Sequence, residues 1–224
     1  NNSDTTVVFV HGYRSRGLND FAWPMRKVYE KGYNVFYIDQ RCHGESEGKY
    51  VTFGIKERRD VQVWANYISE KYPKNKIILA GTSMGGATVL MASDLTLPRN
   101  VIGIIADAPF NSPEEVMHET IRRKKLPVKF VSLFAYYSGI IFGNFNIKYH
   151  TSLKSIRKTK LPILIIHGKS DNTICYKLSE EMFKQTKNKI EYYLFDNADH
   201  CAAYFENPEL YVEIISNFIK KVYK

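Results

Sequence analysis

A serine flanked by two glycines is the part of the sequence best suited to chemistry. Ser83 lies between Gly81 and Gly85 with the spacing G-x-S-x-G, after an apolar strand-like run and before a helical pattern. That context predicts a tight strand-to-helix turn with a strained backbone, where side chains at positions 81 and 85 would collide. The turn would lift the Ser83 hydroxyl above a sheet, where it could act as a nucleophile. The alternative is a serine that merely caps a helix.

A serine hydroxyl attacks a carbonyl efficiently only when a base takes its proton. Four histidines follow Ser83. His200 follows the last strand pattern and precedes the final helix. Hydrolases with a serine on such a strand-to-helix turn carry their base at this place in the chain. We interpret His167 as a structural residue at the end of the preceding strand, and His118 and His150 as surface residues of a long connection.

An acid is expected just beyond the strand that precedes the base. Asp171 has this position, in a turn that contains a glycine, and would fix the tautomer of His200 without taking its proton. Asp107, at the end of an earlier strand, is the rival candidate. Asp196 and Asp199 are too close to His200 in sequence to be favoured and are interpreted as shaping its loop.

Acyl transfer also needs two backbone N–H groups that point at the developing oxyanion. One should come from Met84, directly after the nucleophile. The other should come from Tyr13, in the loop after the first strand, where Gly12 permits the turn. We expect His11 to brace this loop.

The elements that would position these residues alternate along the chain. Apolar, β-branched runs of strand length alternate with stretches of helical period, which predicts an α/β fold with a doubly wound, mostly parallel sheet. The expected strands are Thr6–Val10, Asn34–Asp39, Lys76–Ala80, Val101–Asp107, Pro162–His167 and Glu191–Phe195. The expected helices are Glu57–Tyr72, Ala87–Leu95 and a final helix that starts at Pro208 with Asn207 as its N-cap.

One connection, about residues 110–160, is longer than a simple crossover. Within it Ser112–Lys125 and Pro127–Phe142 have helical patterns, and the second is rich in Phe, Tyr, Leu and Ile. We interpret this insertion as a lid over the active site, with a plain pair of surface helices as the alternative. The whole chain, residues 1–224, is then expected to form one domain.

Composition narrows the possible classes. The formal net charge is +9, but the lysines are scattered and no nucleic-acid-binding motif accompanies them, so we expect no nucleic-acid partner. Two basic clusters, Arg122–Lys125 and residues 154–160, are interpreted as solvated helix faces.

Cys42, Cys175 and Cys201 fit neither a disulfide framework nor a metal motif. No apolar run is long enough to span a membrane, and no signal peptide opens the chain. We expect no metal and no organic cofactor.

With these motifs in place, the sequence resembles the α/β-hydrolase superfamily along essentially its whole length, and more narrowly a group of poorly characterised bacterial hydrolases that often carry an extra N-terminal segment. The matching segments are Val10-His11-Gly12-Tyr13, Asp39-Gln40-Arg41-Cys42-His43-Gly44-Glu45-Ser46, Gly81-Thr82-Ser83-Met84-Gly85-Gly86, His167-Gly168-Lys169-Ser170-Asp171 and Asp199-His200. The resemblance implies Ser83, Asp171 and His200 as a catalytic triad, with Tyr13 and Met84 as oxyanion donors.

The sequence departs from the superfamily pattern in two ways. Cys42 replaces a usual glycine, and is either a packed or a reactive thiol. The chain also opens almost directly with the strand that usually comes third, so we expect that the first strands are missing. The composition favours a cytoplasmic location, with a membrane anchor or export through a missing N-terminal segment as the alternative.

Together these features predict a serine hydrolase that cleaves a small-molecule carboxylic ester or other acyl substrate through an acyl-enzyme on Ser83. A peptidase or thioesterase with the same triad, and a non-catalytic binding protein on this scaffold, are the alternatives. The basic, aromatic insertion would suit an enzyme that acts on membranes, although the sequence offers no clean amphipathic anchor.

Overall fold

The fold is built on one sheet whose strands are all parallel. The computed structural model describes residues 3–186 and 190–223, and these residues form six strands in the order β2-β1-β3-β4-β5-β6. The strands are β1 (Thr5–Val10), β2 (Asn34–Ile38), β3 (Lys76–Thr82), β4 (Val101–Asp107), β5 (Ile163–Gly168) and β6 (Ile190–Phe195). The order reverses direction after β2, so the carboxyl ends of β1 and β3 flank a switch point where ligands bind in such sheets.

Successive side chains of a strand point to opposite faces, and both faces of this sheet are covered. Val7 and Phe9 of β1 pack in one core cluster, and Val8 and Val10 pack in the other. This double coverage explains why the strands are apolar almost throughout and do not alternate with polar residues.

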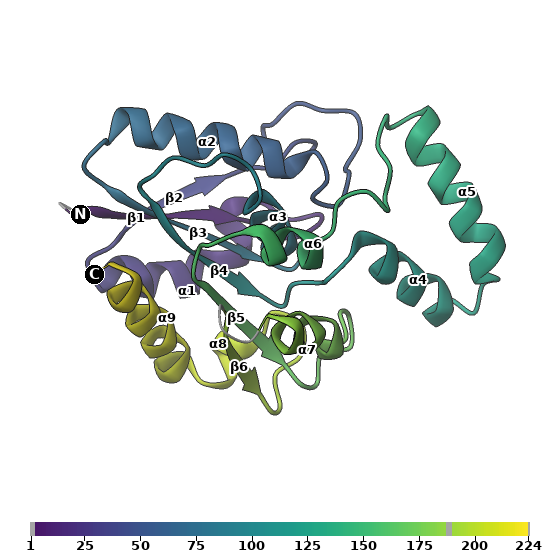
Figure 1. The fold of residues 1–224 in the computed structure, drawn as a ribbon. Coiled ribbons are helices and arrows are strands. Elements are labelled where there is room, and N and C mark those ends of the chain that lie inside the picture. The colour runs from purple at the N-terminus through teal and green to yellow at the C-terminus, as the bar shows by residue number, and fades with distance from the viewer. Residues whose placement is uncertain (1–2, 187–189, 224) are drawn as a thin grey trace.

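Helices cover the two faces in two layers (Figure 1). α1 and α9 pack on the face that carries Val7, whereas α2, α3, α6 and α7 contribute to the core cluster around Val8. The described helices are α1 (Gly17–Glu30), α2 (Glu57–Lys71), α3 (Met84–Ala92), α4 (Pro113–Arg123), α5 (Val128–Ile141), α6 (Ser152–Lys158), α7 (Tyr176–Gln185), α8 (Ala203–Glu206) and α9 (Pro208–Tyr223).

The predicted strands all exist, with ends shifted by up to two residues, and the final helix begins where expected. The Asn207 side chain accepts a hydrogen bond from the Leu210 N–H at 3.0 Å, as an N-cap does. The helix predicted at Ala87–Leu95 starts earlier, at Met84, directly after the turn. The prediction missed α1, α7 and the two short helices α6 and α8; α1 carries Pro24 in its interior, which obscures a helical pattern.

The long connection forms a helical insertion that is closed at its base. The Leu153 N–H donates to the Asn111 carbonyl oxygen at 3.2 Å, so the chain leaves and returns at neighbouring points. Between these points lie α4 and α5, which stand apart from the sheet and its flanking helices (Figure 1). The remaining helix, α6, packs against α3 and leads into β5.

Candidate active site

The backbone around Ser83 is strained in the way that the G-x-S-x-G spacing predicts. Ser83 has φ 53° and ψ −118°, a conformation that residues with a side chain seldom adopt. A Cβ at Gly81 would lie 2.5 Å from the Gly85 backbone, and a Cβ at Gly85 would lie 2.1 Å from the Val10 carbonyl oxygen. Both positions therefore admit only glycine, and the turn places Ser83 at the N-terminus of α3.

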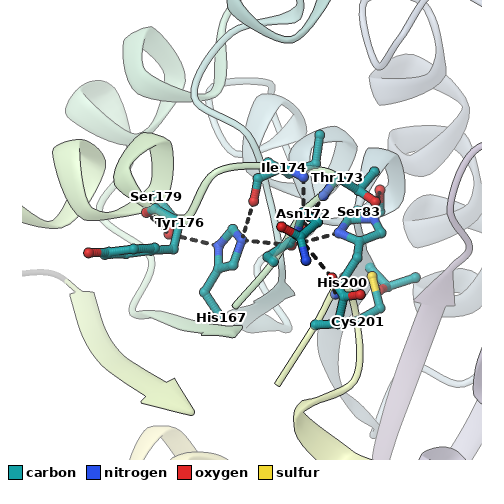
Figure 2. Close-up of polar contacts among 12 residues, drawn as sticks. Ser83, His167, Asn172, Thr173, Ile174, Tyr176, Ser179, His200 and Cys201 are labelled. Atoms are coloured by element: carbon teal, nitrogen blue, oxygen red, sulfur yellow. Dashed lines mark hydrogen bonds and ion pairs between the residues drawn. The ribbon is translucent and has the colours of Figure 1, made fainter. Parts of the chain in front are cut away.

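The structure brings Ser83, His200 and Asp171 together in one hydrogen-bonded chain, and Figure 2 shows His200 beside Ser83. His200 Nε2 lies 2.9 Å from Ser83 Oγ, and His200 Nδ1 lies 2.7 Å from Asp171 Oδ2. Asp171 accepts hydrogen bonds only, so Nδ1 carries the imidazole proton and Nε2 accepts from the serine hydroxyl. This is the tautomer that a general base requires.

Asp171 is held as a buried carboxylate. Its Oδ1 accepts the backbone N–H groups of Thr173 and Ile174, each at 2.7 Å, and its Oδ2 accepts from two imidazoles. Burial alone would raise the pKa of Asp171, but the hydrogen bonds from His167 and His200 outweigh it and hold the pKa well below its usual range. The group stays charged throughout the neutral pH range.

The second imidazole on Asp171 belongs to His167, a contact that the sequence analysis did not anticipate. His167 is fully buried, and its Nε2 lies 3.1 Å from both Asp171 Oδ2 and the Ile174 carbonyl oxygen. Both neighbours are acceptors, so Nε2 carries a proton, and Nδ1 lies 2.8 Å from the Ser179 hydroxyl. Tyr192 lies 2.9 Å from that hydroxyl and extends the chain into β6. The four-residue spacing of His167 and Asp171 at a strand end is the signal that could have revealed the contact.

Asp199 joins the loops that carry the acid and the base. Its Oδ1 accepts the Asn172 N–H at 2.9 Å and the His200 N–H at 2.8 Å, so it shapes the loop as expected. The rival acid, Asp107, does not contact His200: its Oδ2 accepts from the Tyr211 hydroxyl at 2.9 Å, in the core. Burial raises the pKa of Asp107 to about 6.

The loop of the predicted oxyanion donor Tyr13 is braced by two histidines. The Gln40 N–H donates to His11 Nε2 at 2.9 Å, and the Arg14 N–H donates to His43 Nε2 at 3.1 Å. The close approach of Gly85 to the β1 backbone brings this loop beside the start of α3, where the other predicted donor, Met84, is the first residue. The expected bracing role of His11 agrees with these contacts.

Two other residues differ in part from their expected surroundings. Cys42 keeps the positive φ, 64°, that explains why glycine is usual there, and burial raises its thiol pKa, which favours a packed, protonated thiol. His150 is partly buried and lies 3.3 Å from the Arg58 guanidinium, so it is less exposed than the surface position that we expected. His118 is also only partly exposed, on α4.

An open pocket of about 490 Å³ lies between α5 on one side and, on the other, Tyr13 together with the loop of residues 49–53. Tyr50, Val51 and Phe53 line one side, and Ala135, Ser138 and Gly139 of α5 line the other. Val51 and Phe53 also pack against the core cluster that contains Met84, the residue after Ser83. Its volume falls in the usual range for small-molecule sites.

A parallel sheet covered on both faces, with Ser83 on the turn after β3, defines the chain as an α/β hydrolase. The family model described as serine aminopeptidase, S33, matches residues 1–156, and the chain belongs to that family.

Comparison with known proteins agrees with this assignment. The uncharacterized protein YqkD of Bacillus subtilis is 26% identical over 216 residues, which cover 96% of this chain and 70% of YqkD. The structure of the Pyrococcus furiosus esterase Pf2001 matches with a TM-score of 0.80 and 26% identity, over 99% of this chain and 83% of that one. A lipase-esterase related protein from Clostridium acetobutylicum shares the fold, with a TM-score of 0.71, 24% identity and coverage of 97% and 95%. Among the described residues, none of the helices has the length and hydropathy needed to cross a membrane.

Proposed function

We propose that the protein hydrolyses carboxylic esters through an acyl-enzyme on Ser83. The observation that carries this proposal is the continuous chain from Ser83 Oγ through His200 to Asp171, with both hydrogen bonds below 3 Å. Ser83 Oγ attacks the ester carbonyl carbon as His200 Nε2 takes the hydroxyl proton. When the tetrahedral intermediate collapses, the alkoxy group leaves as an alcohol with that proton. Water then attacks the acyl-enzyme by the same route and releases the acid.

The negative charge of the intermediate needs donors that are already in place. We assign this role to the N–H groups of Met84 and Tyr13, which come from the start of α3 and the braced loop after β1. Each such donor is worth about 3 kcal/mol of transition-state stabilisation. The N-terminus of α3 adds a favourable dipole at the same place.

The pocket between α5 and the Tyr13 loop is the proposed site for the acyl chain, and α5 is then the lid. Its lining is largely aromatic and aliphatic, with small residues on the side of α5. Because Ala135 and Gly139 have small side chains, the pocket on this side of α5 would be deep enough to admit an unbranched acyl chain beside the helix.

The family description favours a second candidate, cleavage of a peptide at its free amino end. An aminopeptidase must bind the ammonium group of its substrate, and an acidic side chain is the usual partner for such a group. Tyr13 also lines a second pocket, next to Arg14 and Arg16. Among the described residues that line these two pockets, basic side chains such as Arg14, Arg16 and Lys49 occur and acidic ones do not. The local charge therefore favours a neutral or anionic acyl substrate.

Hydrolysis of p-nitrophenyl esters of increasing acyl length tests the proposal, with Ser83→Ala as the inactive variant. Ser69→Ala serves as the matched control, because Ser69 lies on α2 and its hydroxyl donates to the Asn100 side chain, which is not part of the site. We expect Ser83→Ala to lose at least about 10⁴-fold in kcat and Ser69→Ala to match the parent protein.

A fluorophosphonate probe gives a second readout that does not depend on the choice of ester. It should label the parent protein at Ser83 and leave Ser83→Ala unlabelled. Turnover of aminoacyl amides without turnover of any ester would favour the peptidase instead. Ester hydrolysis that survives in Ser83→Ala would show that the proposed mechanism is wrong.

A further inference from the structure

The outward face of α5 is unusual for a helix on the surface of a globular protein. Its large apolar side chains point to solvent: Phe130 is 72% exposed, Phe134 is 76% exposed and Ile141 is 68% exposed. Their spacing of four and seven residues places them on one stripe, which Leu133 and Tyr137 widen. The small residues of the helix face inward to the pocket. The polarity of the helix is thus inverted relative to a helix that packs on a core. An exposed apolar stripe of this kind marks a surface that binds another molecule or a membrane.

The charge around this stripe is of one sign. Between Glu119 and Asp171 the sequence contains no acidic residue. Arg122, Lys124, Lys125 and Lys129 are all exposed, at the end of α4 and in the first turn of α5, next to the apolar stripe. An apolar stripe bordered by cations is complementary to an anionic membrane, in which acyl chains lie below a layer of negatively charged headgroups.

We propose that α5 docks on an anionic lipid surface. The helix would lie in the plane of the interface with Phe130, Phe134 and Ile141 among the acyl chains and the basic residues at the phosphates. With 14 residues it is too short to span a bilayer, so it would rest on the membrane. The proposal does not depend on the esterase activity, because docking requires no reaction.

A second copy of the chain fits this face less well. An interface between two copies would bring two acid-free segments of a protein with net charge +9 close to each other. Like charges in that arrangement oppose association. An anionic membrane, in contrast, gains from every cation that reaches it.

The geometry also gives the docked protein an orientation. The inner side of α5 lines the pocket at Tyr13, and its outer side carries the apolar stripe. A membrane under α5 would therefore lie next to the mouth of the proposed acyl pocket. Figure 1 shows α5 at one edge of the molecule, apart from the sheet.

Vesicle flotation with the full chain tests the apolar part of the proposal. We expect binding to phosphatidylcholine vesicles that contain about a third phosphatidylglycerol, and a loss of at least about tenfold in Phe130→Glu/Phe134→Glu. The matched control is Val63→Glu/Tyr193→Glu, which adds the same charge at exposed apolar positions of α2 and β6 and should bind like the parent. Circular dichroism of each variant separates docking from folding.

Neutralising the cations tests the electrostatic part. The quadruple variant Arg122→Gln/Lys124→Gln/Lys125→Gln/Lys129→Gln should lose about tenfold or more in binding, whereas four exposed lysines elsewhere, changed to Gln at Lys31, Lys74, Lys177 and Lys220, should change it by less than about threefold. Binding of the parent should also fall as salt rises.

The opposite results would overturn the proposal. Equal binding to vesicles with and without phosphatidylglycerol would remove the charge argument, and parent-like binding by Phe130→Glu/Phe134→Glu would place the contact elsewhere. Absence of vesicle binding, with a dimer in sedimentation velocity that Phe130→Glu/Phe134→Glu dissociates, would assign the stripe to a second copy. Because Ser83→Ala should dock normally, failure of docking and failure of the esterase proposal are distinguishable.

Discussion

Replacement of Asp171 by asparagine should reverse the tautomer of His200. Asp171 Oδ1 accepts two backbone N–H groups, which can only donate, so the carbonyl oxygen of the new amide must take that position. The amide NH₂ then takes the place of Oδ2 and faces His200 Nδ1. Two donors cannot pair, so His200 moves its proton to Nε2 and can no longer accept the proton of Ser83.

The expected size of the effect follows from this geometry. The serine–histidine distance of 2.9 Å is unaffected by the change, so binding of substrate should persist while proton transfer is lost. An inverted tautomer of this kind costs about 10⁴-fold in kcat, or about 5.4 kcal/mol of activation free energy. KM should stay within a few-fold of the parent value.

Steady-state hydrolysis of the best p-nitrophenyl ester measures both constants, and the structure supplies a matched control. Asp107→Asn makes the same chemical change at another buried strand-end carboxyl, which bonds to Tyr211 and not to His200. We expect Asp107→Asn to keep activity within about fivefold of the parent.

Two results would refute this reasoning. A loss of less than about tenfold in Asp171→Asn, with the protein folded, would mean that the orientation forced by the two backbone N–H groups does not control His200. A larger loss in Asp107→Asn than in Asp171→Asn would restore Asp107 as the acid.

The remaining predictions concern the surroundings of the site and the stability of the fold. His167→Leu should lower kcat about tenfold at unchanged KM, since Asp171 loses one hydrogen bond, and His167→Gln, which can still donate, should recover part of it; equal kinetics in both variants would contradict a positioning role. Because burial raises the pKa of Asp107 in the folded protein from its ordinary 3.8 to about 6, the folded state keeps the proton to higher pH, and this group should lower the free energy of unfolding by about 3 kcal/mol as pH rises from about 3 to about 7. Urea unfolding of Asp107→Asn should lack that component, and an identical pH slope in both proteins would exclude the raised pKa. Asp94→Ala should destabilise the protein by about 3–5 kcal/mol, because it leaves the buried Arg58 guanidinium without its carboxylate at 2.7 Å; a melting temperature within about 2 °C of the parent would show that the pair is not important.

Much of the site followed from the sequence because its geometry is imposed by local chemistry. The Ser83 turn requires glycine at positions 81 and 85, and parallel strands bring their carboxyl ends to one edge. Chain order then selected His200 and Asp171 from several candidates, and the structure brings both to Ser83.

What the sequence could not give depends on contacts between distant segments. The contact between His167 and Ser179 forms only because α7 packs beside β5, and α7 was not predicted. The pair of His150 and Arg58 joins segments 92 residues apart. The outward direction of the α5 stripe was also hidden, because a helical period shows that residues share a face but not which way that face points.

The hydrogen bond between Leu153 and Asn111 has a consequence for how this enzyme could diversify. Since the chain enters and leaves the insertion at adjoining points, residues 112–151 form a separable helical segment, while α6 stays packed on α3 and the crossover from β4 to β5 stays complete. Such a segment could be exchanged between homologues by recombination while the sheet and the helices that flank it stay unchanged. If the proposed acyl pocket and the proposed docking face are both correct, substrate preference and membrane binding would change together, because α5 contributes to both.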